Sequence, residues 1–357
     1  MPGLRSDLIS AGGVPFDTGD LPWLGEFGWF PLGRPAFEVV SVTRLLLERI
    51  VRRRVLALPD VEIREGTRVT GLRSARDGWE IEVAGGEPVT ADLVVDASGR
   101  SSRLPKWLDA LGIPAAETTQ VDAKVGYATR LYASSDAIEV PGVVVLATPE
   151  TLTGGLALRV EHGQWLVLAV GYGPQRPPRD ADGFESFLRG LHDSALADIV
   201  RHAVPQSDVA VHRQTANQRH HYEKIQGWPA GLLVVGDALC AFNPVYGQGI
   251  TVAAREALLL RSALTSGFES HHAQKLLRRF TSVTSLPWAV ATNEDTRFPT
   301  SNTQQSPTQR LLDWWTREIA LLAVHGNGRA VDTLHSIYHL MGSPAQFLHP
   351  ALSAAAI

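Results

Sequence analysis

Four residues between positions 237 and 249 are of types that could together hold a polyhydroxy ligand. The stretch from Leu232 to Gly249 reads LLVVGDALCAFNPVYGQG, an apolar run closed by Asp237 and followed by a glycine-containing loop that Pro244 stiffens. A carboxylate at a strand end can accept hydrogen bonds from sugar or ribityl hydroxyls, and Gly247 and Gly249 let a ligand approach the backbone closely. A helix that starts there offers N–H groups and a partial positive charge. The alternative interpretation is a buried strand followed by a plain glycine turn.

Two strands are predicted to place such residues at one edge of a sheet. The runs 91–97 and 231–236 are continuously apolar and close on Asp96 and Asp237, which is typical of parallel strands buried on both faces. Between them, residues 120–175 alternate and are β-branched, which indicates antiparallel strands. The sequence therefore predicts an α/β fold whose parallel nucleotide-binding sheet is interrupted by an antiparallel sheet, with ligands at the carboxyl ends of the parallel strands.

The other segments predict the helices and the division of the chain. Apolar residues at helical spacing indicate helices over 44–57, 248–265, 308–324 and 330–342, and residues 285–310 are expected to form a polar, proline-containing loop. We expect a first nucleotide-binding part (1–105), an antiparallel substrate-binding sheet (106–214), a second nucleotide-binding part (215–265) and a C-terminal helical region (266–357).

Composition narrows the class of protein. The chain has 357 residues with 20% charged residues and a net charge of −4, which gives no general electrostatic case for binding nucleic acid. The basic run Arg49–Arg54 is interpreted as the solvated face of a helix, with an anion or membrane-surface patch as the alternative. The single cysteine, Cys240, excludes an intrachain disulfide, and no apolar run is long enough for a membrane span, so we expect a cytoplasmic protein.

The stretch LLVVGDALCAFNPVYGQGITVAAREALLL closely resembles the second FAD-binding motif of the group A flavoprotein monooxygenases, the relatives of para-hydroxybenzoate hydroxylase. The resemblance implies that Asp237 holds the ribityl chain of FAD. It also implies that the helix start Pro244-x-x-Gly247-x-Gly249 faces the isoalloxazine ring, with Gln248 and Ile250 as backbone neighbours.

Two further stretches carry the same resemblance. ADLVVDASGRSSRLPKWL is similar to the middle motif of the family, which implies that Asp96, Gly99 and Arg100 shape the site around the pyrophosphate and the reductant. The alternative is a strand-end turn without such a role. VTRLLLERI places Arg44 at the helix start where family members contact FAD, and a guanidinium can fork onto a phosphate. The alternative for Arg44 is a solvated helix arginine.

One feature of the family is missing from the sequence. The strand, Gly-x-Gly-x-x-Gly turn and helix that bind the ADP half of FAD do not occur, because AGGVPFDTG has no flanking strand and helix, and a proline-rich loop follows Gly171 and Gly173. We therefore expect the Rossmann-like parallel sheet to be N-terminally incomplete, with the ADP-binding portion outside this chain. An inactive fragment that cannot hold FAD is one alternative reading.

The resemblance implies an FAD-dependent monooxygenase that hydroxylates or epoxidises a small organic substrate through a flavin hydroperoxide, with O2 and with NAD(P)H as reductant. No side-chain acid or base is expected to be catalytic, and the sheet over 120–215 is expected to form the floor of a pocket for an apolar or aromatic substrate. A flavin-dependent reductase or dehydrogenase of the same fold is the other alternative. The Trp-x-Trp-x-Ile-Pro signature of flavin halogenases is absent, and His335 and His339 are interpreted as an amphipathic helix face rather than metal ligands.

Overall fold

The computed structural model describes residues 1–76, 78–133 and 139–353, which fold into two compact units. The first, here called the sheet unit, comprises residues 1–63, 123–214 and 296–357. The second, here called the motif unit, comprises residues 64–122 and 215–295. Both units mix helices with sheets, which confirms the predicted α/β class. The four-part division expected from the sequence stays a prediction.

The sheet unit is organised around a seven-stranded sheet with the order β14-β10-β13-β12-β11-β2-β3. All its neighbouring strands are antiparallel except β2, which pairs in parallel with β11. The antiparallel strands predicted over 120–175 are therefore confirmed. The strands are β2 (Trp23–Gly25), β3 (Gly28–Trp29), β10 (Val125–Ala133), β11 (Gly142–Val145), β12 (Thr153–Val160), β13 (Gln164–Tyr172) and β14 (Ala210–His212).

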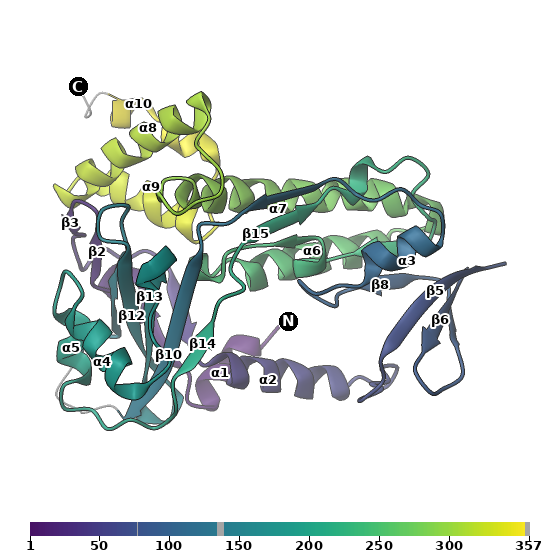
Figure 1. The fold of residues 1–357 in the computed structure, drawn as a ribbon, viewed down its shortest axis with the longest axis horizontal. Helices are drawn as coiled ribbons and strands as arrows, with labels where there is room; N and C mark the ends of the chain where they lie inside the picture. Colours follow the sequence, from purple (N-terminus) through teal and green to yellow (C-terminus); the bar gives the residue numbers. More distant parts are fainter. Residues whose placement is uncertain (77, 134–138, 354–357) are drawn as a thin grey trace. The chain divides into compact units, whose positions relative to one another are not determined.

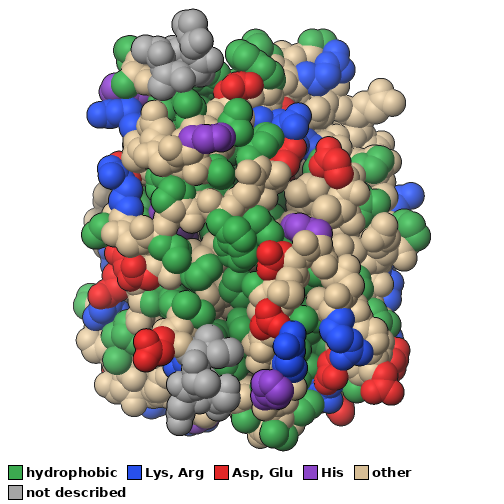
Figure 2. All heavy atoms as spheres, turned by 90° about the vertical axis from the view of Figure 1, so that its left-hand side faces the viewer, with side chains coloured by type: hydrophobic (Ala, Val, Ile, Leu, Met, Phe, Trp, Pro, Cys, Tyr) green, Lys and Arg blue, Asp and Glu red, His purple; other side chains and the backbone are tan. Residues whose placement is uncertain are grey.

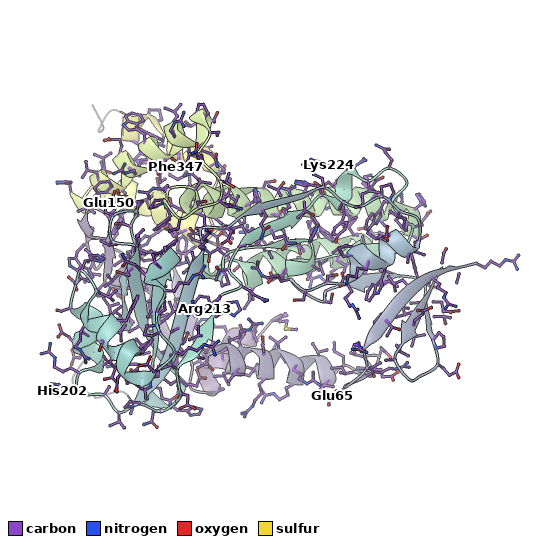
Figure 3. The ribbon with its side chains drawn as sticks, viewed as in Figure 1. Glu65, Glu150, His202, Arg213, Lys224 and Phe347 are labelled. Atoms are coloured by element: carbon purple, nitrogen blue, oxygen red, sulfur yellow. The ribbon has the colours of Figure 1, made fainter. Side chains whose placement is uncertain are left out.

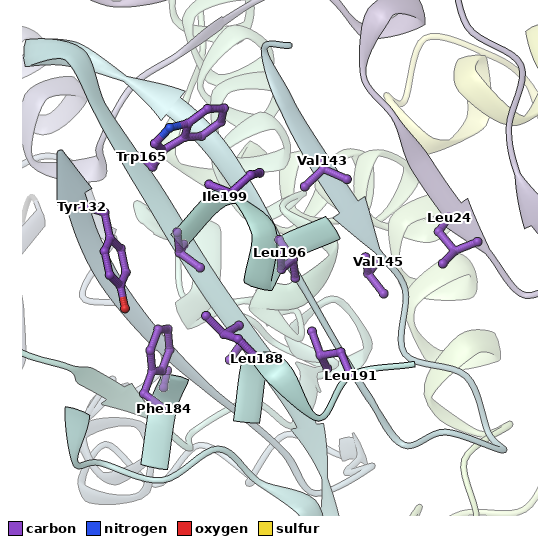
Figure 4. Packing of buried hydrophobic residues seen from close by; sticks show 14 residues of the cluster. Leu24, Tyr132, Val143, Val145, Trp165, Phe184, Leu188, Leu191, Leu196 and Ile199 are labelled. Carbon is purple, nitrogen blue, oxygen red and sulfur yellow. The ribbon is translucent and has the colours of Figure 1, made fainter. Parts of the chain in front are cut away.

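One face of this sheet is covered by the helices α4 (Ala181–Arg189) and α5 (Ala195–Val200) (Figure 1). Since side chains alternate along a strand, every second residue of β10 and β13 points into this core. The core contains Tyr132 and Trp165 from the strands and Leu188 from α4, all with no exposed surface (Figure 4). Trp165 is therefore a core residue.

The ends of the chain add small elements to the sheet unit. At the N-terminal side β1 (Val14–Asp17) pairs antiparallel with β4 (Glu38–Ser41), and α1 (Leu4–Ser10) packs on α2 (Arg44–Leu56). The C-terminal helices are α8 (Pro307–Val324), α9 (Gly328–Tyr338) and α10 (Pro350–Ser353), so the predicted helices over 44–57, 308–324 and 330–342 are confirmed. The Trp315 indole donates to the carbonyl of Phe347, labelled in Figure 3, at 2.7 Å.

The motif unit contains the two predicted strands that end on acids. β8 (Val94–Asp96) and β16 (Leu232–Val234) pair in parallel, which confirms the predicted parallel strands, and the register places Val234 opposite Asp96. Two three-stranded sheets accompany this pair, one of β5, β6 and β7 and one of β17, β15 and β9. The bounds are β5 (Val69–Ala75), β6 (Gly78–Val83), β7 (Val89–Ala91), β9 (Thr118–Val121), β15 (Asn217–His220), β17 (Cys240–Ala241) and α3 (Leu104–Ala110).

Two long helices run side by side in the motif unit (Figure 1). α6 (Gly249–Thr265) is the predicted helix that follows the glycine loop. α7 (Ala273–Asp295) corrects an expectation, because the predicted loop over 285–310 is helical up to Asp295 despite Pro287 inside the helix. Proline removes one backbone hydrogen bond from a helix, but one face of α7 is buried on both sides of Pro287, at Thr284 and Ala291, and packing offsets that loss.

The surface agrees with the near-neutral composition. On the face in Figure 2, acidic and basic side chains are interspersed among hydrophobic ones. Among the described helices, none combines the length and the apolar character that crossing a membrane requires. Cys240 is buried, and burial raises the pKa of its thiol, so it packs as a small core residue.

Leu188 offers a test of the sheet-unit core. Its side chain is fully buried between α4 and the sheet. Leu188→Ala is expected to lower the free energy of unfolding by about 2–5 kcal/mol, because it leaves a cavity. Val204→Ala, at a side chain that is 62% exposed, is the control and should change stability by less than about 0.5 kcal/mol. Chemical denaturation of both variants measures this, and equal effects would contradict the described packing.

Candidate cofactor site at the start of α6

Asp237 lies at the carboxyl end of β16, in the single turn Gly236–Ala238 that follows the strand. Gly236 has a left-handed φ of 61°, which lets the chain turn sharply there. The Asp237 side chain is exposed, and its Oδ1 lies 3.6 Å from the point where a Cβ on Gly249 would sit. The structure therefore brings the predicted aspartate and the predicted helix start together.

The loop between them ends in a second left-handed glycine. After the turn Pro244–Tyr246, Gly247 has a φ of 66°, and no atom lies within 4 Å of the point where its Cβ would be. Pro244 and Ile250 are exposed beside it, Ile250 with 60% of its surface. Replacing Gly247 would strain the backbone, and the space beside it is open on the exposed side of the loop.

The start of α6 has no side-chain cap. A side chain just before α2, α4, α8 and α9 accepts a hydrogen bond from a backbone N–H of the first helical turn. The side chain of Gln248, the residue before α6, accepts no such hydrogen bond. Gln248 is only 3% exposed, and both polar atoms of its amide lack a hydrogen-bond partner among the described residues. An uncapped helix start carries partial positive charge and suits an electron-rich group.

Glu256 on α6 anchors the turn that carries Asp237. It has no exposed surface, and its Oε2 accepts the backbone N–H of Gly236 at 2.6 Å. Burial raises the pKa of this carboxyl to about 7; the hydrogen bond from Gly236 opposes the shift, and the nearby charge of Asp237 adds to it. Sequence reasoning missed Glu256, although an acid seven residues after Gly249, on the same helix face, was a signal for such a contact.

Asp96 has a different role from Asp237. Its carboxylate accepts the backbone N–H of Ser98 at 2.9 Å and the hydroxyls of Ser98 and Ser102, each at 2.5 Å. It is 7% exposed, and Gly99 with a φ of 81° completes the turn. The carboxylate is therefore engaged in shaping the turn, and the indirect role at the cofactor that the family resemblance implies for Asp96 stays a prediction.

Arg100 links this turn to the loop before α6. Its guanidinium donates to the carbonyl of Phe242 at 2.8 Å and to the carbonyl of Ala216. One side chain of the middle motif therefore holds the backbone of the second motif. The predicted contact between Arg100 and a cofactor stays a prediction.

Arg44 lies in the sheet unit, at the first position of α2. The preceding Thr43 caps that helix, and the side chain of Arg44 is 81% exposed and pairs with Glu48 at 2.6 Å. An exposed ion pair between residues four apart contributes little to stability. The contact with FAD predicted for Arg44 stays a prediction.

Comparison with known proteins identifies the family of the chain. A family model described as an FAD binding domain matches residues 34–293, more than half of the chain. The chain belongs to this family. The predicted membership among the group A flavoprotein monooxygenases is confirmed, and with it FAD as the cofactor and an FAD-dependent oxidoreductase as the kind of enzyme.

Three individual proteins are similar to this chain in sequence or in fold. Protein Rv3254 of Mycobacterium tuberculosis is 30% identical over 336 residues, which cover 88% of this chain and 69% of that protein. The flavin-dependent brominase Bmp2 shares the fold with a TM-score of 0.68 and 14% identity, over 99% of this chain and 85% of its own. PqsL of Pseudomonas aeruginosa is similar in fold with a TM-score of 0.58 and 16% identity, over 83% of each chain. The two structural likenesses concern the fold.

The residues at the start of α6 fit one half of FAD. An exposed carboxylate suits the ribityl hydroxyls, and an uncapped helix start beside an open glycine suits the flavin ring. Among the described residues, no strand and glycine-rich turn leading into a helix is present that would match the ADP half in the same way. Likewise, the described residues contain no group of three or more potential metal ligands, and His335 and His339 lie on α9 and just after it.

Glu256→Gln tests the anchoring of the Asp237 turn. Because the folded-state pKa of Glu256 is raised, its contribution favours folding below about pH 4.5 and is lost as the pH rises through about 7. The amide keeps an oxygen for Gly236 but cannot ionise. Between pH 5 and pH 8 the wild type should therefore lose about 1–3 kcal/mol of stability relative to Glu256→Gln. Urea unfolding at both pH values measures the difference, and parallel pH profiles would contradict it.

Proposed function

We propose that the chain is an FAD-dependent monooxygenase that uses NAD(P)H and O2 to hydroxylate or epoxidise a small organic substrate. One oxygen atom would enter the product and the other would leave as water, with the two extra electrons supplied by NAD(P)H. The arrangement of Asp237 beside the uncapped, glycine-flanked start of α6, within an FAD-binding family, is the observation that supports this proposal.

Three residues at the start of α6, Asp237, Gly247 and Gly249, have proposed roles that their surroundings suit. Asp237 would accept hydrogen bonds from the ribityl hydroxyls, while Gly247 and Gly249 would let the flavin ring approach the helix start. Arg44 would contact the phosphate or ribityl region. Bound FAD would supply the redox chemistry, namely electron transfer from the nicotinamide and activation of O2. The protein would position the ring and exclude water, and no side-chain acid or base is assigned.

One face of the seven-stranded sheet is apolar, which favours the proposal of an apolar substrate. Its face opposite the α4 and α5 core carries Leu156 and Leu158 on β12 and Leu166 and Leu168 on β13, all half-buried. Leu156 pairs directly with Leu168, and Leu158 with Leu166, so the four side chains form a continuous patch. We propose this leucine patch as the floor of the substrate pocket, in line with the apolar or aromatic substrate expected from the sequence.

Whether an oxygen atom of O2 enters the product distinguishes the proposed monooxygenase from a reductase or dehydrogenase of the same fold. With 18O2, NAD(P)H, FAD and a panel of apolar and aromatic candidate substrates, we expect one labelled oxygen per product molecule by mass spectrometry. Labelled water in place of labelled O2 should leave the product unlabelled. Product that forms without 18O would exclude the monooxygenase and favour the alternative.

Asp237→Ala tests the cofactor contact itself. Losing a carboxylate that accepts hydrogen bonds from ligand hydroxyls should weaken FAD binding about 10- to 100-fold, on the order of 1.5–3 kcal/mol. Asp92→Ala, at another exposed aspartate of the motif unit, is the matched control and should bind FAD like the wild type. Titration followed by flavin fluorescence measures both. Equal affinities for wild type and Asp237→Ala would refute the assigned role.

A further inference from the structure

Asp295, the last residue of α7, has no exposed surface and makes four short contacts within the motif unit. Its Oδ2 accepts the side-chain amide of Asn217 at 2.6 Å and that of Asn243 at 3.2 Å. Its Oδ1 accepts the same Asn243 amide at 3.0 Å and the hydroxyl of Tyr246 at 2.7 Å. Every partner donates, so the site is built for a carboxylate.

Two of the three partners of Asp295 belong to the loop that leads into α6, and the third, Asn217, begins β15. Asn243 and Tyr246 lie within that loop, and the backbone N–H of Asn243 donates to Oδ1 of Asn217 at 2.7 Å. Oδ1 of Asn243 in turn accepts the N–H of Val245 at 3.2 Å. One buried carboxylate therefore fixes both ends of the turn that is followed directly by Gly247 and Gln248.

The balance of forces on Asp295 leaves it able to titrate near neutral pH. Burial raises the pKa of the carboxyl to about 7, and the hydrogen bonds from Tyr246, Asn243 and Asn217 oppose that shift. The titratable groups that act on it are Tyr246, which faces it from the loop, and Glu294, its neighbour on α7, whose charge raises the pKa further. The asparagines on the other packed elements carry no charge.

We propose that Asp295 is a positioning residue that holds residues 243–248, and through them the start of α6, in the conformation that receives the flavin, and that protonating Asp295 loosens this loop. Only the link to the flavin rests on the proposed function. The asparagine amides cannot accept a proton, so a protonated Asp295 can donate only towards Tyr246. The contact with Tyr246 is then reversed in direction. The asparagine amides donate to an uncharged acid instead of a carboxylate, which weakens those hydrogen bonds and holds the loop less firmly.

The first experiment concerns the loop alone and needs no cofactor. Hydrogen exchange by mass spectrometry on the cofactor-free full chain compares wild type, Asp295→Asn and Tyr246→Phe. Asp295→Asn puts an N–H group against at least one asparagine donor, and Tyr246→Phe removes one tether while keeping the ring. Protection factors of the peptides over 243–250 are expected to fall about tenfold in both variants, with peptides from β16 unchanged.

Glu223→Gln is the matched control for hydrogen exchange. Glu223 is a nearly buried carboxylate of the same unit, but it pairs with Arg219 and His221. In Glu223→Gln, the peptides over 243–250 should exchange hydrogen at the wild-type rate. Unchanged protection of 243–250 in both Asp295→Asn and Tyr246→Phe would overturn the proposal. If Asp295→Asn does not fold, the result for Tyr246→Phe alone decides.

The second experiment connects the loop to the cofactor through a pH profile. In the wild type, FAD affinity should be about 5- to 10-fold weaker at pH 6 than at pH 8, since Asp295 is mostly protonated at the lower pH. Asp295→Asn should bind weakly at both pH values and lose most of this difference, whereas Glu256→Gln, which removes the other carboxyl of the site with a pKa of about 7, should keep it. A wild-type pH profile retained in Asp295→Asn would overturn the proton dependence. Failure of the wild type to bind FAD at any pH, with the exchange results as expected, would contradict the proposed function and leave the loop assignment standing.

Discussion

The candidate site depends on a clamp of two charged side chains on two neighbouring backbone segments. Arg100 donates to the carbonyls of Ala216 and Phe242, and the residues that follow each of them, Asn217 and Asn243, are bound by Asp295. The Arg100 guanidinium thus binds two backbone carbonyls, and the Asp295 carboxylate binds the side chain of the residue that follows each carbonyl. Because both charges are satisfied by several hydrogen bonds, the clamp avoids the cost of leaving a buried charge without partners.

At α6 the clamp holds the start of the helix, which no side chain caps. At α2, α8 and α9 a serine, threonine or asparagine before the helix fixes the first turn, but such a side chain would occupy the N–H groups that a ligand needs. At α6 the preceding loop is held by Asn243, whose side chain accepts the N–H of Val245. Glu256, within the helix, holds the turn that carries Asp237 by accepting the N–H of Gly236. The N–H groups at the helix start can then face outward without the loop losing its conformation.

The sequence predicted the parts of this arrangement that lie close together along the chain. The acid-closed runs at 91–97 and 231–236, the glycine loop and the helix after it were all recognisable from local patterns, and β8, β16 and α6 confirm them. The Asp295 contacts join residues 78, 52 and 49 positions apart, and no local pattern marks them. Asp295 was also missed because the sequence predicted a loop after residue 285. A proline such as Pro287 locally disfavours a helix, and the tertiary burial that keeps α7 helical is not visible in a local pattern.

The two strand-end acids show why the same pattern can serve different purposes. Asp96 and the residues it binds form a closed turn, because Ser98 and Ser102 follow at the spacing that lets both hydroxyls reach its carboxylate. After Asp237 the chain continues with Ala238, Leu239 and Cys240, whose side chains are apolar and buried and cannot satisfy a carboxylate in that way. The carboxylate of Asp237 is therefore left at the surface beside Gly249, while that of Asp96 is drawn inward. The surroundings therefore favour the proposed ligand contact at Asp237, which apolar residues and then glycines follow, over a direct contact at Asp96, which serines follow.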